Sequence, residues 1–276
     1  MYSIDQLKHI SIDIRKKIVE ITHSAKGGHI GGSLSSVDIL VALYFSIMRY
    51  DPSDPSRPDR DRFIMSKGHS VEGLYCVLAR AGYFPEALLS EYGKFDTVFY
   101  GHPTLKVPGI EMPTGSLGHG LSIAVGMALG AKRDKATSRI FVLMGDGEQA
   151  EGSIWEAAMA ASHYKLDNLV AIIDNNNLQI SGHIDSVMRL SSLRQKYEAF
   201  GWNVAEIDGH DFHQLIEAFN TAPWRPGMPN LIIAHTIKGH GVSFMENSAS
   251  WHHKVLTDED FERAIDELDR SEKEAV

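Results

Sequence analysis

Two apolar runs, each followed at once by glycine or polar residues, constrain the fold of this chain more than any other feature. Arg139–Met144 leads into Gly145-Asp146-Gly147, and Leu169–Asp174 leads into Asn175-Asn176. Between them, Glu151–Tyr164 carries apolar residues at helical spacing. Unbroken apolar runs are typical of parallel strands that are buried on both faces. The sequence therefore predicts a strand–helix–strand unit with polar residues at the carboxyl ends of both strands, where open α/β sheets bind ligands.

The residue types at this predicted edge favour a diphosphate that is held through a divalent cation. Asp146 and the amide oxygen of Asn176 are hard oxygen donors, and the main-chain carbonyl of Leu178 would be a third. Mg²⁺ takes a few protein oxygens and completes its octahedron with phosphate and water, and Ca²⁺ or Mn²⁺ are alternatives. Glycines beside Asp146 let a phosphate approach the backbone. Gly-Asp-Gly alone is common in turns, so the prediction depends on the helix and the asparagine pair that follow it.

The remaining pattern predicts an α/β fold of three layers, with a mostly parallel sheet and helices on both faces. A capping box at Ser3 and Gln6 opens a first helix that ends by Gly27. His29 follows among several glycines and is expected in a loop. Further strands are expected at 62–66, 203–207 and 231–234, and further helices from 35 onward, after 69, from 115 onward, at 151–164, 190–200 and 211–219, and from 257 onward.

Composition narrows the classes of protein that this chain can belong to. Its 276 residues suit one α/β domain, and its 43% hydrophobic and 23% charged residues are ordinary for a globular protein. A net charge of -9 without any Lys/Arg run argues against a nucleic-acid surface. Cys76 is the only cysteine, so no intrachain disulfide can form. The amino terminus begins no signal segment, and Ile39–Met48 is too short to cross a bilayer, so we expect a cytoplasmic protein without a membrane partner.

The motif resembles the thiamine diphosphate fingerprint, and the sequence around it resembles transketolase. The resemblance runs in the order of the family from near residue 26 to near residue 254. Its segments are Lys26-Gly27-Gly28-His29, Ser66-Lys67-Gly68-His69, Gly101-His102-Pro103, Thr114-Gly115-Ser116-Leu117-Gly118, Gly145-Asp146-Gly147-Glu148, Glu151-Gly152-Ser153-Ile154-Trp155-Glu156, Lys238-Gly239 and Trp251-His252.

The resemblance assigns expected roles to particular residues. It implies thiamine diphosphate and a divalent cation as cofactors, with Asp146, Asn176 and the Leu178 carbonyl as metal ligands. It implies His29, His69, His102, His252 and Glu151 as catalytic residues. It also matches Glu151 and Glu156 to carboxylates that help link the two active sites across the dimer. Glutamates near a helix amino terminus also favour the helix dipole without any catalytic role. The implied cofactor contacts are His69, Gly115, Ser116, Leu117, Gly147, Asn176, Lys238 and His252.

The family also implies a reaction and a partner. A transketolase moves a two-carbon ketol unit from a ketose phosphate to an aldose phosphate, and histidines suit proton transfers near neutral pH. The domain that binds the aminopyrimidine and supplies its activating glutamate is absent from residues 1–276. We therefore expect one diphosphate-binding domain that is inactive alone and works in an α2β2 assembly with a separate carboxyl-terminal subunit.

The sequence is also compatible with other functions. The alpha subunit of a 2-oxoacid dehydrogenase and an enzyme like deoxyxylulose-phosphate synthase share the two fingerprint segments, although the histidine set favours transketolase. A non-catalytic scaffold subunit is a further alternative. Full-length transketolases commonly have Gln where this chain has His119, and Gly where it has His253. Gly32 also replaces a residue that is often polar in the family, and positions 177 and 179 (Asn177 and Gln179) differ between relatives. These departures leave open which ketose is the donor and whether it belongs to pentose phosphate or to more specialised sugar metabolism.

Overall fold

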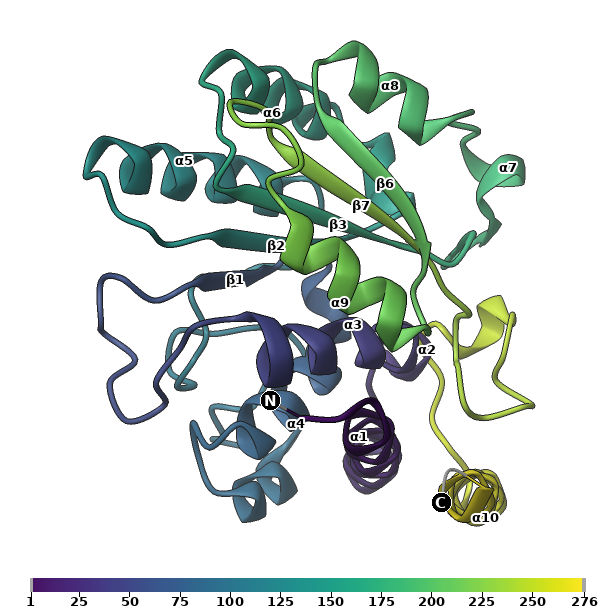
Figure 1. The fold of residues 1–276 in the computed structure, drawn as a ribbon. Helices are drawn as coiled ribbons and strands as arrows, with labels where there is room; N and C mark the ends of the chain where they lie inside the picture. The colour runs from purple at the N-terminus through teal and green to yellow at the C-terminus, as the bar shows by residue number, and fades with distance from the viewer. Residues whose placement is uncertain (1, 275–276) are drawn as a thin grey trace.

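A five-stranded parallel sheet forms the centre of the molecule (Figure 1). The computed structural model describes residues 2–274. The order of strands across the sheet is β1, β2, β3, β7, β6, and every neighbouring pair is parallel. This confirms the predicted fold class. The strands are β1 (Arg62–Met65), β2 (Ile140–Gly145), β3 (Leu169–Asn175), β6 (Asn203–Asp208) and β7 (Asn230–His235).

Helices cover both faces of the sheet, and each face has its own hydrophobic core (Figure 1). On one face lie α5 (His119–Arg133), α6 (Gly152–His163) and α8 (Leu193–Ala199). The other face is covered by α2 (Ile30–Ser35), α3 (Val37–Ala42) with the π-helical turn η1 (Leu43–Ile47), α4 (Val71–Arg80) and α9 (Phe212–Thr221). Shorter elements are η2 (Gly68–Ser70), η3 (Glu86–Glu91), η4 (Gly147–Ala150), β4 (Leu178–Gln179), β5 (Gly182–His183), α7 (Ile184–Val187) and η5 (Ala249–Trp251).

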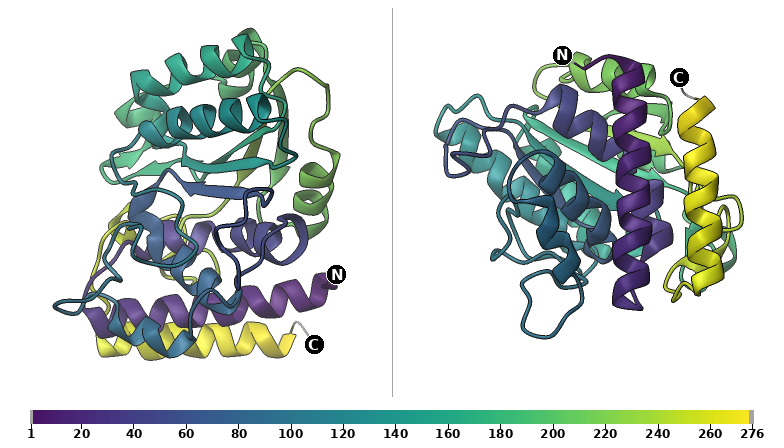
Figure 2. Two further views of the ribbon diagram at one scale, coloured as in Figure 1. Left: turned by 90° about the vertical axis from the view of Figure 1, so that its left-hand side faces the viewer. Right: turned by 90° about the horizontal axis from the view of Figure 1, so that it is seen from below.

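Two long helices, the first and the last of the chain, lie side by side outside the face that α2, α3, α4 and α9 cover (Figure 2). These are α1 (Ile4–Ala25), which begins with the predicted capping box, and α10 (Asp258–Glu274). They run antiparallel, so His23 near the end of α1 bonds Asp258 at the start of α10. Leu7 and Leu268 are fully buried. The pair therefore packs as an amphipathic layer, as its hydrophobic spacing predicts.

The structure differs from the sequence-based expectation in two places, both after residue 176. His29 lies in a loop as expected, directly before α2, and Gly31 and Gly32 lie inside that helix, where they pack closely against neighbouring segments. The helix expected at 190–200 is shorter, Leu193–Ala199. The hairpin β4–β5 and helix α7 precede it and have no counterpart in the expectation, since elements of two to four residues carry no periodic signal.

The small residues of α5 divide between two environments. Ala124 and Ala128 are fully buried against the sheet and α6. Gly126 and Gly130 face open space, because a side-chain carbon on either glycine would meet no other atom within 4 Å. Packing within this chain therefore explains the alanines but not the two glycines.

Among residues 2–274, none of the helices is both long enough and apolar enough to cross a membrane.

Candidate functional site

The carboxyl ends of β2 and β3 bring the two fingerprint segments together. In the parallel register Gly145 is the partner of Asp174, so the residues that follow each strand lie side by side. Asp146 is 2% exposed. One of its carboxylate oxygens accepts a hydrogen bond from the Gly147 amide at 2.7 Å, and the other accepts one from the Asn177 amide. Asp146 therefore contacts the loop that carries Asn176.

Two of the three expected oxygen donors, Asn176 and Leu178, lie in the loop that Asp146 contacts. Asn176 is buried, and its amide oxygen accepts a hydrogen bond from the Leu178 amide at 3.1 Å. The Leu178 carbonyl accepts a hydrogen bond from Lys238 Nζ at 3.3 Å. A cationic group thus already lies beside one of the three expected donors. The donor set is oxygen only, which suits Mg²⁺ with phosphate and water as the remaining ligands.

Electrostatics at this edge also favour a cation. Burial, together with the nearby Asp174 carboxylate, raises the pKa of Asp146 to about 7. Burial and the charge of Lys67 lower the pKa of Lys238 to about 8. Asp146 makes no salt bridge within the described part of the chain, and its hydrogen bonds come from backbone amides. A bound divalent cation would relieve the cost of burying this carboxylate, so the residues present fit the implied metal.

A buried ion pair that sequence reasoning misses lies beneath the strand ends. Lys67 forms a salt bridge with Asp174, and both side chains are almost fully buried. Asp174 also accepts hydrogen bonds from the hydroxyls of Ser35 (2.6 Å) and Thr236. Burial alone would raise the pKa of Asp174, but Lys67 and these hydroxyls hold it below the usual range. The pair joins β1, β3 and the segment after β7, so it fixes the positions of the strand ends around the site.

The glycine-rich loop before α5 is held against the strand ends by one buried carboxylate. Glu148 accepts hydrogen bonds from the amides of Gly118 (2.8 Å) and Gly145 (3.0 Å) and from the Ser66 hydroxyl. Burial raises the pKa of Glu148, although these donors oppose the shift. Gly118 has a φ of 87°, a conformation that favours glycine. Glu148 thereby ties Gly118, which ends the loop that carries Gly115, Ser116 and Leu117, to Gly145 at the end of β2.

Four predicted histidines from separate parts of the sequence meet around His29. Its ring centroid lies 5.2 Å from that of His69, 5.5 Å from that of His252 and 6.2 Å from that of His102. A fifth ring, that of His253, lies 4.7 Å from His29. Sequence reasoning identifies His253 only as a departure from the family, because spacing alone does not show where a residue near Trp251 points.

Five rings form this histidine cluster (His29, His69, His102, His252 and His253), and the three less exposed ones, His29, His69 and His252, are neutral at physiological pH. Burial, with a contribution from His253, lowers the pKa of His29 to about 4. Burial and Lys67 lower the pKa of His69 to about 2, and burial and Lys238 lower that of His252 to about 3. Nδ1 of His29 and Nδ1 of His252 are buried without a hydrogen-bond partner among the described residues. Unpaired ring nitrogens in a neutral cluster suit hydrogen bonds with a polyhydroxylated ligand.

A second buried carboxylate positions His29. Glu72, from α4, accepts hydrogen bonds from the His29 amide (2.9 Å), the Ser33 hydroxyl (2.7 Å) and the Tyr92 hydroxyl. Gly28 has a φ of 132°, and a side chain there would collide with Glu72. The glycines before His29 therefore allow the close approach of the chain to this carboxylate.

The two predicted glutamates lie apart from the histidine cluster. Glu151 precedes α6, and Glu156 lies in its second turn; both are exposed. Neither forms a salt bridge or side-chain hydrogen bond among residues 2–274. Glu151 adjoins Gly118, since a side-chain carbon on that glycine would meet the Glu151 side chain. Their expected catalytic and linking roles stay predictions that require a partner subunit.

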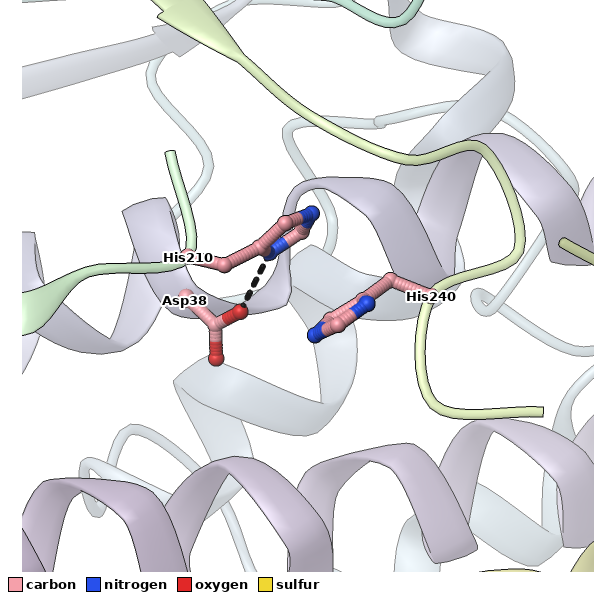
Figure 3. Close-up of side chains that lie close together, drawn as sticks. All are labelled: Asp38, His210 and His240. Carbon is pink, nitrogen blue, oxygen red and sulfur yellow. Dashed lines mark hydrogen bonds and ion pairs between the residues drawn. The ribbon is translucent and has the colours of Figure 1, made fainter. Parts of the chain in front are cut away.

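A second cluster, Asp38, His210 and His240, has the composition of a metal site but not its chemistry (Figure 3). Arg15 makes a bidentate ion pair with Asp38 at 2.6 and 3.0 Å, and it holds the pKa of Asp38 well below its usual range against the effect of burial. His210 Nδ1 bonds Asp38 at 2.7 Å, and its Nε2 accepts a hydrogen bond from the Ile237 amide at 2.9 Å. Both ring nitrogens are thus in use, so the cluster anchors the segment that follows β7 rather than offering free ligands.

Comparison with known proteins identifies the family of this arrangement. The family model described as "Transketolase, thiamine diphosphate binding domain" matches residues 7–273. An apulose-4-phosphate transketolase subunit of Phocaeicola vulgatus is 54% identical over 94% of this chain and 92% of its own length. The 6-deoxy-6-sulfo-D-fructose transketolase subunit of a Clostridium species is 43% identical over 96% of both chains.

Longer proteins match over part of their length. Human transketolase is 41% identical over 96% of this chain but only 42% of its own length. The transketolase structure from Campylobacter jejuni superposes with a TM-score of 0.88 at 28% identity, and it covers 99% of this chain and 48% of that one. The chain therefore spans less than half of these full-length proteins and nearly all of the separate subunits.

Proposed function

Since this chain belongs to the family of transketolase thiamine diphosphate-binding domains, we propose that it supplies the diphosphate-binding half of a two-chain, thiamine diphosphate-dependent transketolase. The observation that carries the proposal is the match to two proteins that are named as transketolase subunits, over 92% and 97% of their length. The geometry supports it, because oxygen donors, backbone amides and neutral histidines line one edge of the sheet.

We assign the cofactor contacts as follows. Asp146, Asn176 and the Leu178 carbonyl would hold a divalent cation, which we take to be Mg²⁺, and the cation would bind the diphosphate. The amides near Gly115 and Gly147, with Lys238, would contact the same diphosphate. When bound, thiamine diphosphate supplies the carbon nucleophile that makes ketol transfer possible. We expect the side chains of His69, Ser116, Leu117 and His252 to contact the cofactor as well.

The chain itself would supply orientation and proton transfer. His29, His102 and His252 face the space where the sugar would react. Because burial keeps His29 and His252 neutral, each can accept a proton from a substrate hydroxyl or donate a hydrogen bond to one. Glu72 fixes the backbone of His29, so the ring is positioned before substrate arrives.

The remaining machinery would come from a second chain. We propose that a carboxyl-terminal subunit supplies the aminopyrimidine-binding domain and that two copies of each chain assemble as α2β2. The exposed α5 glycines and the exposed Glu151 and Glu156 lie on one side of the sheet and suit such an interface. We also expect the complex to work in the cytoplasm.

For the donor we propose a phosphorylated ketose of specialised sugar metabolism, with apulose 4-phosphate as the first candidate. Two relatives that match this chain at 54% and 46% identity carry that substrate in their names. The 43% identical relative acts, by its name, on a sulfonated ketose instead, so the choice needs an assay.

Purification of the tagged chain from its own cells, followed by identification of co-purifying chains, tests the proposal. The recovered pair should transfer a ketol unit from a ketose phosphate to an aldose phosphate when thiamine diphosphate and Mg²⁺ are added, and the chain alone should not. Full ketol transfer by the isolated chain would contradict the two-chain assembly. Decarboxylation of pyruvate by the pair, without ketol transfer, would instead indicate an enzyme of the 2-oxoacid dehydrogenase type.

A further inference from the structure

We infer that His253 is a specificity-determining residue, whose imidazole contacts the part of the ketose phosphate that lies beyond the two transferred carbons. The inference rests on the proposed transketolase function and concerns the same site. It assigns a role to a residue that the family resemblance does not explain, since full-length members commonly have glycine there.

His253 is the nearest ring neighbour of the central histidine. The centroid of its ring lies 4.7 Å from that of His29, while His69, His252 and His102 lie at 5.2, 5.5 and 6.2 Å. The planes of the His253 and His29 rings are inclined at 63°, so the rings meet edge to face rather than as a stack. Any ligand that contacts His29 from the open side therefore also approaches His253.

The backbone on either side fixes this position. Trp251 is 4% exposed and Leu256 is 1% exposed, so both ends of the segment are anchored in the core. The Trp251 carbonyl packs so closely on α2 that a side-chain carbon on Gly31 would lie 2.7 Å from its oxygen. α2 begins directly after His29. The two histidines are thus held together by packing between their segments, not by a flexible loop.

Helical geometry at residue 252 explains why two consecutive histidines face the same centre. His252 follows η5 with φ -60° and ψ -48°. In a strand, successive side chains point to opposite faces, whereas a helical turn lets neighbours 252 and 253 both approach one side. This is why His252 lies 5.5 Å and His253 lies 4.7 Å from the same His29 ring.

The His253 ring is free to bind a ligand. It is exposed, and no hydrogen bond joins it to another residue within 2–274. His69 lies in η2, just after the end of β1, and the His252 ring stacks on it with centroids 5.1 Å apart; both are less exposed than His253. The histidines therefore run from the strand ends, where the cofactor would lie, outward to His253.

The position of His253 at the outer end of this row of histidines determines which atoms of the substrate it contacts. The carbons that transfer must reach the cofactor, so they occupy the inner end of the row. The outer end is left for the remaining carbons, with their hydroxyls and phosphate, which imidazole can bind by hydrogen bonds. Relative to glycine, the imidazole also fills space, so it favours sugars whose distal part is compact or branched.

Kinetics of the wild-type pair and of pairs that carry His253→Gly or His253→Asn test the inference. Two donors are compared: the ketose phosphate that the wild-type pair uses, and hydroxypyruvate, which carries the same ketol unit and releases carbon dioxide in place of an aldose. His213→Asn, at an exposed histidine in the first turn of α9, is the matched control.

The expected result is a loss confined to the sugar donor. His253→Gly should lower kcat/KM for the ketose phosphate about 10-fold, mainly through KM, because one substrate hydrogen bond is lost. The kcat/KM for hydroxypyruvate should stay within about 2-fold, and His253→Asn should recover part of the loss because an amide also donates and accepts. The control should behave as wild type with both donors.

Two results would overturn the inference. An equal loss with both donors would show that His253 serves the common chemistry or the fold, and no change with either would show that it does not contact substrate. A wild-type pair that turns over neither donor would instead refute the proposed transketolase function.

Discussion

At the scale of single residues, the site depends on charges that the fold buries without neutralising. Asp146 is the main example, because its carboxylate is 2% exposed and receives only backbone hydrogen bonds. Asp174, close by, is neutralised by Lys67. This difference supports the proposal that Asp146 binds a cation, while Asp174 is part of the scaffold.

Replacing this carboxylate should separate stability from function. In the metal-free protein the pKa of Asp146 is about 7, against roughly 4 in an unfolded chain. The folded state therefore holds a proton that the unfolded state has released, and stability falls as pH rises from about 4 to 7. Asp146→Asn should stabilise the metal-free chain at pH 8 by about 1–3 kcal/mol, measured by urea unfolding.

The same variant should abolish binding of thiamine diphosphate with Mg²⁺ to the two-chain complex, measured by calorimetry. An Asp146→Asn chain that is less stable than wild type at pH 8, or that binds the cofactor normally, would contradict the proposed role.

The histidine cluster predicts the opposite dependence on pH. The pKa of His69 is lowered to about 2, so its contribution to stability is present above its unfolded pKa of about 6.5 and is lost as pH falls below that value. Between pH 7 and pH 5, His69→Asn should lose about 1–2 kcal/mol less stability than wild type. His213→Asn, at an exposed position, should lose as much as wild type, and equal losses in all three proteins would show that His69 is not buried as a neutral ring.

At the scale of elements, the segment after β7 carries Lys238, His252 and His253 and is secured by residues far from the site. His210 links Asp38 of α3 to the amide of Ile237, immediately before Lys238. Arg15 of α1 also donates to the His240 carbonyl at 3.2 Å. These contacts hold the segment after β7, which forms one side of the candidate site, against α1 and α3.

Loss of the His210 side chain should weaken the attachment of the segment after β7. His210→Ala leaves the Ile237 amide without its acceptor, so we expect a loss of about 1–3 kcal/mol in the free energy of unfolding. The affinity of the two-chain complex for thiamine diphosphate should also fall about 5-fold, since Lys238 is no longer held in place. Denaturant unfolding and calorimetry measure the two effects, and an unchanged affinity would show that Lys238 is positioned without His210.

The elements that carry a long or regular apolar pattern are the ones that can be predicted from the sequence. All five sheet strands lie within one or two residues of their expected bounds, because strands buried on both faces read as apolar runs. The β4–β5 hairpin and α7 escape prediction because they are short and polar. The Lys67–Asp174 pair and the Glu148 and Glu72 contacts escape it as well. Apart from the bond between Gly145 and Glu148, they join residues that are between 20 and 107 positions apart, and only the tertiary fold brings such residues together.

At the scale of the whole molecule, two features bear on the proposed two-chain enzyme: where the candidate site lies, and how much of its relatives the chain spans. The metal donors, the glycine-rich loop and the histidine cluster all lie at the carboxyl edge of the sheet. The chain spans 92% or more of the two subunits named for apulose 4-phosphate and less than half of the full-length transketolases that it matches. The proposed division of the enzyme between two chains would account for both facts.

The central claim is that Asp146, Asn176 and Leu178 bind one divalent cation that holds the diphosphate. Mn²⁺ in place of Mg²⁺ makes this visible, because anomalous X-ray scattering locates it in crystals of the two-chain complex with thiamine diphosphate. The account predicts a single strong peak about 2.0–2.3 Å from a side-chain oxygen of Asp146, the amide oxygen of Asn176 and the Leu178 carbonyl oxygen. A peak bound elsewhere, or a diphosphate held at this edge without a cation, would contradict it.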